Sequence, residues 1–486
     1  MSAPAIIRLA RPRAGVSVGV TARLSLLRGY ASASGSSELK PNLSYLKPTH
    51  PDTSTPSSTQ SLIKDHSAYL LNTYVRPPLL FTHGKGLTLT DSSKRDYLDF
   101  TAGIAVTALG HSDPGVNEVI DAQSGKLSHA SNIYWNEHAG ELAKSLVENT
   151  KRHGGLGLKA GSSSEDAGAK VFFSNSGTEA NEGALKFARA YGKTIAEDKT
   201  DIVCFTNAFH GRSMGALSVT PNPKYQAPFA PLIPGVKVGE YNETDEEKIR
   251  ALVNDKTCGV IVEPIQGEGG VGEGKVEFFT KLAKRCREVG AILIYDEIQC
   301  GLFRSGTMWA HSEFPIEAQP DIVTMAKPLS NGFPVGAIMV KSSVASIISP
   351  GMHGTTFGGQ PLATAIGVYV LSKLSDPSFI ASLHEVSAHL DSLIQRLPKL
   401  FPGLIKDEEG KLRGRGLIRG IPFKDAKAPA ELVRLARERG VLLLTAGSDA
   451  VRLVPALIVT KEQCDHAVGV IESCLHIMVE DGYGAK

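Results

Sequence analysis

Four apolar runs set the strongest limit on how this chain can fold. They cover residues 170–173, 201–205, 258–263 and 291–296, are rich in β-branched side chains, and show no polar alternation. Such continuous runs are typical of strands buried on both faces of a sheet. Because helical patterns alternate with them from Asp113 onward, the sequence predicts an α/β fold built on a largely parallel sheet.

Other patterns divide the chain into segments. Strand-like stretches at 87–90 and 97–100 precede the alternating region, and long helical patterns with short strands follow it after about residue 366. The latter predict a smaller α+β domain. The expected order is a presequence at 1–30, a flexible Ser/Thr/Pro-rich linker at 31–60, an N-terminal segment at 61–110, a large domain at 111–365 and a small C-terminal domain at 366–486.

The first 30 residues differ in kind from the rest. They hold five arginines and no acid, and the first acidic residue is Glu38. This composition is typical of a mitochondrial transit peptide and predicts a protein of the mitochondrial matrix; a basic tail without a targeting role is the alternative. Removing five of the 52 basic residues leaves 47 against 50 acidic ones, a formal charge of −3. Such a chain gives no electrostatic case for nucleic-acid binding.

Composition excludes some classes of protein. Apolar residues make up 42% of the chain, but no run is long enough to span a membrane as a helix. The six cysteines are scattered without a CxxC pair. We therefore expect no metal centre, no disulfide framework and a reducing compartment.

Lys327 is the first candidate for chemistry. It ends the apolar stretch 322–326 and is followed by Pro328. Desolvation at such a place favours the neutral, nucleophilic amine, which can form a Schiff base with an aldehyde cofactor. The alternative is a surface lysine that extends from the end of a strand into water.

Two glycine-containing turns predict anion sites. Ser176-Gly177-Thr178 follows a strand and opens a helix, so free N–H groups and a hydroxyl would face a phosphate. The second turn, 353–359, surrounds Thr355 and Thr356 with glycines. The alternatives are an ordinary capped helix and a plain glycine-rich turn.

Three further residues follow the ends of strands. Phe209 could cover one face of a flat ring, and Arg212 could hold a substrate carboxylate with two hydrogen bonds. Asp296 ends an apolar run, where a carboxylate needs a partner such as a protonated ring nitrogen. A core Phe, a surface Arg and a helix-capping Asp are the alternatives.

The stretch 267–272 matches the GxGxxG pattern of a dinucleotide site, with Asp296 ending the next strand. Glu263 and Glu268 bracket this loop, and their charges oppose a pyrophosphate; Pro264 also interrupts the passage from strand to turn. We therefore set the dehydrogenase interpretation aside.

Taken in order, SNSGTEANE, FHGR, EPIQGEGG, YDEIQCG and the late lysine resemble the class III pyridoxal-phosphate aminotransferases over roughly residues 65–480. Within that family, the stretches 98–111 and 129–134 are most similar to the branch that acts on acetylornithine. The resemblance implies a fold of type I among pyridoxal-phosphate enzymes, with the cofactor in the large domain, and a homodimer.

The resemblance also implies a role for each residue. Lys327 would carry the cofactor, Asp296 would pair with its ring nitrogen, and Gln299 would lie near its phenolic oxygen. Gly177 and Thr178 would bind phosphate, Phe209 would stack on the ring, and Thr356 would reach the phosphate of the neighbouring subunit. The implied substrate contacts are Arg212, Thr355, Glu268 and Arg452.

The implied reaction moves the δ-amino group of N2-acetyl-L-ornithine to 2-oxoglutarate, a step of arginine biosynthesis. In it, Glu268 would neutralise Arg452 while the amino donor binds and would free it for the 2-oxoglutarate carboxylate. Ornithine, succinylornithine or 4-aminobutyrate are alternative donors, and a non-catalytic assembly partner is a more distant alternative.

Overall fold

The computed structural model describes residues 39–158, 168–408 and 410–484. The expected transit peptide at 1–30 lies outside the described residues. From Pro41 onward the chain forms one compact unit, to which everything below refers. None of the described helices is long and apolar enough to cross a membrane.

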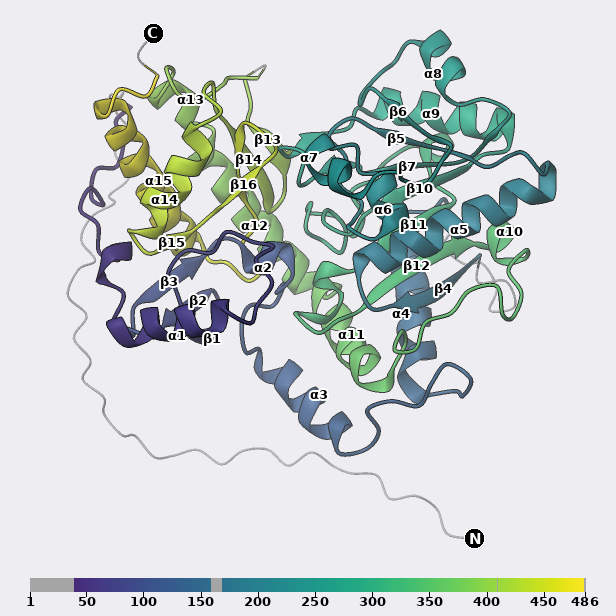
Figure 1. Ribbon diagram of the computed structural model, residues 1–486, viewed down its shortest axis with the longest axis horizontal. Coiled ribbons are helices and arrows are strands. Elements are labelled where there is room, and N and C mark those ends of the chain that lie inside the picture. The colour runs from purple at the N-terminus through teal and green to yellow at the C-terminus, as the bar shows by residue number, and fades with distance from the viewer. Residues whose placement is uncertain (1–38, 159–167, 409, 485–486) are drawn as a thin grey trace. The chain divides into compact units, whose positions relative to one another are not determined.

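A seven-stranded sheet forms the centre of the larger part of the fold (Figure 1), with the strand order β4-β12-β11-β10-β7-β5-β6. Pairs among β11, β10, β7, β5 and β6 are parallel, whereas β12 is antiparallel to both of its neighbours. The four apolar runs of the sequence form β4, β5, β7 and β10, which confirms the largely parallel sheet. The strand bounds are β4 Ala169–Ser174, β5 Asp201–Phe205, β6 Val236–Gly239, β7 Thr257–Val262, β10 Ile292–Asp296, β11 Ile322–Met325 and β12 Gly336–Lys341.

Helices cover both faces of this sheet because its strands are apolar on both sides. On one face, Ala180, Ala184 and Ala188 of α5 pack on alternate residues of the strands; on the other, Phe278 and Leu282 of α9 pack on the intervening ones. The helices of this region are α3 Pro114–Ser124, α4 Glu137–His153, α5 Gly177–Ile195, α6 Met214–Ser218, α7 Pro223–Gln226, α8 Glu246–Leu252, α9 Val276–Val289, α10 Ser342–Ala345 and α11 Pro361–Leu374.

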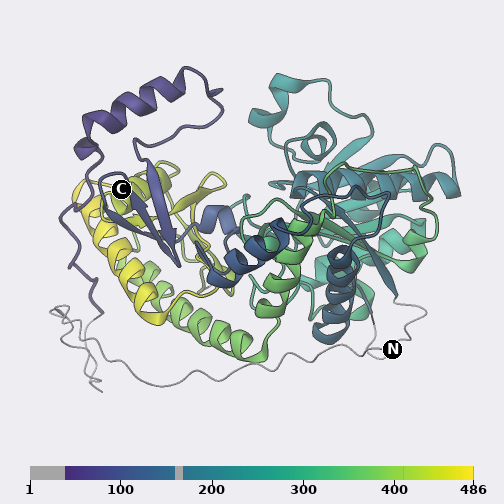
Figure 2. The same ribbon diagram turned by 90° about the horizontal axis from the view of Figure 1, so that it is seen from below.

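The two ends of the described chain meet in a smaller α+β part. Strand β15 from the C-terminal region pairs with β3 from the N-terminal region, and Figure 2 shows the N-terminal strands beside the C-terminal helix. A second sheet has the order β13-β14-β17-β16. Bounds are α1 Ser57–Ser67, β1 Phe81–Lys85, β2 Thr88–Asp91, β3 Asp96–Asp99, α2 Ala102–Ala105, α12 Pro377–Ile394, α13 Leu397–Leu400, β13 Arg413–Arg415, β14 Ile418–Pro422, α14 Ala428–Arg437, β15 Val441–Leu442, β16 Leu444–Ala446, β17 Ala450–Leu453 and α15 Lys461–Glu480.

Part of the expected linker at 31–60 packs on this smaller part. The Asn42 N–H donates to the Glu472 carboxylate at 2.6 Å, and the Arg437 guanidinium contacts the carboxylate of Asp52. Residues 42–52 are thus tied to the C-terminal helices rather than free in water. The expected boundary at residue 366 falls inside α11.

Gly192 sets how closely α5 approaches the sheet. A Cβ there would lie 2.5 Å from both the Cβ of Cys258 in β7 and the backbone oxygen of Lys199. We expect Gly192→Ala to destabilise the protein by about 1–3 kcal/mol, because the close packing leaves no room for a methyl group. The measurement is the midpoint of thermal unfolding.

Gly140 in α4 is the matched control. It is exposed, and a Cβ there would meet nothing within 4 Å. Gly140→Ala should raise the midpoint, since alanine favours a helix over glycine by about 0.5–1 kcal/mol. Equal midpoints for the two variants would contradict the packing argument.

Candidate active site

Seven of the residues singled out in the sequence line one pocket of about 680 Å³. They are Gly177, Thr178, Phe209, Arg212, Asp296, Gln299 and Lys327. A neighbouring cleft of about 800 Å³ shares Phe209 with this pocket and includes Glu268 and Tyr225. Asp296 ends β10, and Lys327 and Phe209 follow β11 and β5. The carboxyl ends of parallel strands share one edge of a sheet, which is why these side chains meet.

Asp296 is buried at the base of the pocket. Its Oδ2 accepts from the Asn181 amide at 2.7 Å and lies 2.8 Å from His210 Nδ1, while its Oδ1 accepts from the Ile298 N–H at 3.0 Å. The carboxylate can only accept, so His210 Nδ1 carries the proton in this contact. Thr324 of β11 donates in turn to the Asn181 amide oxygen at 2.8 Å.

Lys327 begins the short 3₁₀ helix Lys327–Ser330 and lines the pocket with its partly exposed side chain. Its pKa is lowered, first because the protein removes water from the amine and second because of the Arg452 charge. Asp296 and the two glutamates Glu263 and Glu268 act in the opposite direction. A lowered pKa increases the fraction of neutral amine near neutral pH, as a nucleophilic lysine requires.

Glu263 is a buried carboxyl group of the same pocket. Its two oxygens accept from the N–H groups of Phe209 at 2.9 Å and Gly267 at 3.3 Å. Burial, and next the charge of Asp296, raise its pKa well above the usual value. Glu263 therefore holds both Phe209, which is expected to cover the cofactor ring, and the loop that carries Glu268.

The N-terminus of α5 also lines the pocket. Ser176 caps the helix by accepting from the Glu179 N–H at 3.4 Å, and Thr178 Oγ1 accepts from the Arg212 and Ser213 N–H groups at 3.2 Å. A Cβ at Gly177 would lie 2.8 Å from the Ile298 side chain. The first N–H groups of a helix lack helical acceptors, so this end suits an anion.

Arg452 of β17, in the smaller part of the fold, contacts Gln299 of the pocket and Glu268 of the neighbouring cleft. Its guanidinium donates to the Gly267 carbonyl at 2.9 Å, to Gln299 Oε1 at 2.5 Å and to Glu268 Oε2 at 3.1 Å. Arg452 is buried, and burial lowers its pKa. The structure thus brings Glu268 and Arg452 together.

Thr355 and Thr356 do not line the pocket of their own chain. Thr355 accepts from the Asn175 amide at 3.0 Å, and Thr356 is exposed. Their loop is held by Asn132, which donates to the carbonyl of Gly358 at 2.7 Å.

Three buried polar residues that hold this site together were given no part in it by the sequence: Asn181, His210 and Glu263. The first two stand inside the motifs SNSGTEANE and FHGR, and Glu263 follows an apolar strand just as Asp296 ends one. The same signal that selected Asp296, a carboxylate at the end of an apolar run, could have selected Glu263.

The glycine-rich loop at 267–272 connects the antiparallel pair β8 (Ile265–Gln266) and β9 (Gly272–Glu273). A dinucleotide site needs a strand followed directly by a helix, and α9 begins only at Val276. The geometry therefore agrees with setting the dehydrogenase interpretation aside.

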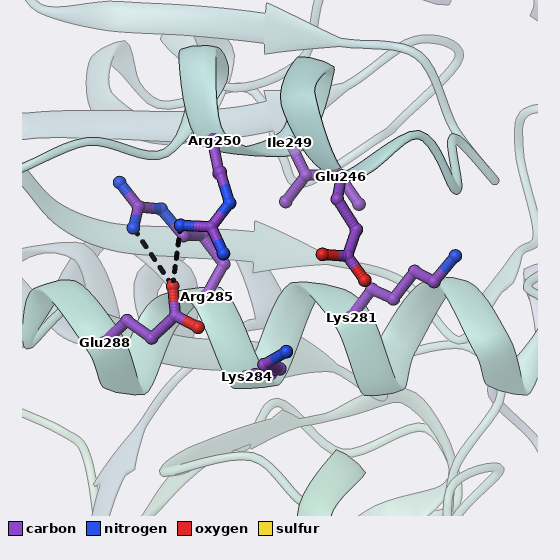
Figure 3. A pocket seen from close by; sticks show the side chains of 7 residues that line it. All are labelled: Glu246, Ile249, Arg250, Lys281, Lys284, Arg285 and Glu288. Carbon is purple, nitrogen blue, oxygen red and sulfur yellow. Dashed lines mark hydrogen bonds and ion pairs between the residues drawn. The ribbon is translucent and has the colours of Figure 1, made fainter.

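A pocket between α8 and α9 (Figure 3) has a different character. Both Arg250 and Arg285 contact Glu288, at 3.5 and 3.0 Å. Lys281 contacts Glu277 at 2.8 Å. Surface ion pairs of this kind contribute little free energy and indicate a solvated face. Within the described ranges, no group of His, Cys, Asp and Glu side chains is placed to hold a metal ion.

Comparison with known proteins decides the family. The model of the class-III aminotransferases matches residues 70–475. The chain belongs to the class-III aminotransferases. It is 48% identical to the mitochondrial acetylornithine aminotransferase of Neurospora crassa, over 93% of each chain.

Solved structures of class-III aminotransferases share the fold. An ornithine aminotransferase from Toxoplasma gondii, with pyridoxal phosphate partially occupying its active site, matches with a TM-score of 0.76 and 28% identity, over 88% of this chain and 96% of that one. N-acetylornithine aminotransferase from Stenotrophomonas maltophilia matches with a TM-score of 0.69 and 30% identity, over 86% and 99%. These matches confirm the fold expected from the sequence.

As a class-III aminotransferase, the chain uses pyridoxal phosphate, and the pocket fits this cofactor chemically. The α5 N-terminus offers N–H groups to a phosphate, Asp296 offers a carboxylate to a ring nitrogen, and Lys327 offers an amine to an aldehyde. A Cβ at Gly211 would lie 2.2 Å from Thr178 Oγ1, so only glycine fits beside this hydroxyl.

Glu263 makes the stability of the cofactor-free protein depend on pH. The pKa of Glu263 is higher in the folded than in the unfolded protein, so the folded protein binds this proton more tightly. The proton's contribution to the free energy of unfolding is therefore complete below pH about 4.5, the unfolded value. It falls as the pH rises toward the pKa of the folded protein. We expect Glu263→Gln to flatten this fall, as measured by thermal unfolding between pH 4.5 and 8.

The exposed Glu247 of α8 provides the control. Glu247→Gln should follow the wild-type pH profile. A Glu263→Gln protein whose profile also runs parallel to wild type would show that Glu263 titrates normally in the folded state.

Proposed function

We propose that the chain transfers the δ-amino group of N2-acetyl-L-ornithine to 2-oxoglutarate, giving N-acetyl-L-glutamate 5-semialdehyde and L-glutamate. The observation that carries this proposal is the 48% identity, over 93% of each chain, to the N. crassa acetylornithine aminotransferase. The pocket supports the reaction type, since an amine, a paired carboxylate and an anion site line the same space.

Pyridoxal phosphate supplies, when bound, an aldehyde for the amino group and a ring that accepts electrons from the reacting carbon. In the proposed site, Gly177 and Thr178 would hold its phosphate and Phe209 would cover its ring. Asp296, which Asn181 and His210 fix in place, would keep a proton on the ring nitrogen. Gln299 would contact the phenolic oxygen.

Lys327 acts in two ways in this proposal. Its amine would hold the cofactor, and the freed Nζ would move a proton between the substrate carbon and the cofactor, first as general base and then as general acid. The lowered pKa of the amine suits both roles, because a group that titrates nearer the working pH exchanges protons readily.

Arg212 and the Glu268–Arg452 pair recognise the far ends of the substrates. Arg212 binds a carboxylate, with Thr355 of the glycine-rich loop near substrate. Glu268 neutralises Arg452 at 3.1 Å in the present arrangement. We propose that Glu268 stays there while the amino donor binds and yields to a carboxylate of 2-oxoglutarate in the second half-reaction.

The proposed compartment is the mitochondrial matrix. The N. crassa and Yarrowia lipolytica relatives are named as mitochondrial, and residues 1–30 have the arginine-rich, acid-free composition described above. With the presequence removed, the large domain, the small C-terminal domain and the N-terminal segment would form the mature protein together.

A substrate panel tests the activity. With 2-oxoglutarate as acceptor, we expect kcat/KM for N2-acetyl-L-ornithine to exceed that for free ornithine by at least about tenfold, or ~1.4 kcal/mol in transition-state binding. The two donors differ because acetylation removes the charge of the α-amine. The panel should also contain succinylornithine and 4-aminobutyrate. A preference for one of these or for free ornithine would overturn the assignment.

Lys327→Ala provides the control for the mechanism. It should lose turnover on every donor, while Lys341→Ala, at the half-buried end of β12 and outside the pocket, should retain it. Full turnover by Lys327→Ala would contradict its assigned role.

We also propose a homodimer. Apolar side chains gather on two exposed stretches of the isolated chain: Tyr69, Leu71 and Val75 on one, and Ile133, Tyr134 and Trp135 on the other. Trp135 is 99% exposed and Val75 fully so. A monomer rarely exposes so many large apolar groups together. A partner that covers Ile133, Tyr134 and Trp135 would also approach the loop of Thr356, because the adjacent Asn132 donates to the Gly358 carbonyl of that loop. This fits the proposed contact of Thr356 with the neighbouring subunit's phosphate.

Trp135 makes the dimer measurable. The chain has two tryptophans, and the other, Trp309, is fully buried. We expect light scattering to give twice the chain mass, and dilution to shift tryptophan emission to longer wavelength as Trp135 meets water. Trp135→Phe should abolish the shift.

A charge at the interface supplies the second arm. Trp135→Glu should weaken the dimer, whereas Val276→Glu, at the exposed start of α9, should not. A monomeric wild type at micromolar concentration would refute the dimer.

A further inference from the structure

The guanidinium of Arg212 lies over the face of an aromatic ring that the sequence did not point to. Its central carbon is 3.5 Å from the centre of the Tyr225 ring and 5.6 Å from that of Phe209. The two rings are themselves 6.4 Å apart and nearly perpendicular. Arg212 therefore lies between the rings of Tyr225 and Phe209, and Phe209 is the residue expected to cover the cofactor ring.

The guanidinium has no anionic partner there. Across the parts of the chain that are described, the only hydrogen bond of Arg212 runs from its backbone N–H to Thr178, and its side chain is exposed at the pocket. Stacking occupies the face of a guanidinium but leaves its N–H edge free. The edge is thus available to a carboxylate while the face is held.

Tyr225 is itself fixed. It belongs to α7, where its N–H donates to the Asn222 carbonyl at 2.9 Å. The next residue, Gln226, donates from its amide to the Leu217 carbonyl of α6 at 2.9 Å. The N-terminus of α6 is held in turn by Glu182 of α5, which accepts from the Gly215 N–H at 2.7 Å. Tyr225 is therefore anchored, through α6, to the helix whose N-terminus forms the anion site.

We propose that Tyr225 is a positioning residue that holds the Arg212 guanidinium ready for a substrate carboxylate. An arginine fixed before binding loses less rotamer entropy when the carboxylate arrives. The inference rests on the proposed role of Arg212 and extends it to a specificity element: Tyr225 strengthens binding of carboxylate-bearing substrates and leaves other amines unaffected.

The test compares holoenzyme variants at Tyr225. Tyr225→Leu removes the ring face, so the KM for 2-oxoglutarate and for N2-acetyl-L-ornithine should rise by roughly 3- to 30-fold while kcat changes much less. Tyr225→Phe restores the ring and should restore the low KM. With 1,4-diaminobutane, which has no carboxylate, the half-reaction followed by the visible absorbance of the cofactor should be as fast in Tyr225→Leu as in wild type.

A double-mutant cycle isolates the pair. In an Arg212→Ala background, Tyr225→Leu should add no further rise in KM, because there is no guanidinium left to position. If Tyr225→Leu does not fold, Tyr225→Met takes its place with the same expected KM. An unchanged KM in the Leu or Met variant, an equal loss with the diamine, or full additivity in the cycle would each overturn the proposal.

Failure of the proposed substrate leaves this test intact. If the donor proves to be another ω-amine, the 2-oxoglutarate half-reaction still reports on Tyr225 and Arg212. If acetylornithine is confirmed as the donor and Tyr225→Leu leaves KM unchanged, only the proposed role of Tyr225 is refuted.

Discussion

The buried carboxylate of Asp296 is the group on which the pocket depends. An isolated buried charge costs several kcal/mol, so it must be held by donors. Those donors come from three directions: His210 after β5, Asn181 on α5 and the Ile298 N–H beyond β10. Thr324 of β11 then fixes Asn181. One charge thus ties α5 to three strands, and these elements also carry Thr178, Phe209 and Lys327.

Much of this arrangement could be predicted from periodicity. Continuous apolar runs become strands covered on both faces, and residues that follow such runs meet at one edge of the sheet. Asp296, Lys327 and Phe209 therefore assemble as expected, without any knowledge of their distances. The antiparallel β12 was not predicted, because direction depends on the path of the connecting loop rather than on the pattern within the strand.

Contacts between distant polar residues could not be predicted in this way. Asn181 lies 115 residues from Asp296, and Arg452 lies 184 residues from Glu268. No local pattern encodes such pairs, so the second was expected only from the family resemblance and the first was missed. The same holds for Tyr225, whose ring has no periodic partner in the sequence. The packing of Asn42 against Glu472, 430 residues away, is a further case.

Charge balance explains why the Glu268–Arg452 pair suits two substrates in one pocket. Arg452 lowers the pKa of Lys327, while Glu268 and the other acids of the pocket raise it. In the proposed exchange, a carboxylate of 2-oxoglutarate replaces Glu268 beside Arg452, so one negative charge is substituted for another. The field at the Lys327 amine then stays similar in both half-reactions. A single lysine can accordingly serve as base and acid for both substrates, since its proton affinity need not be reset between them.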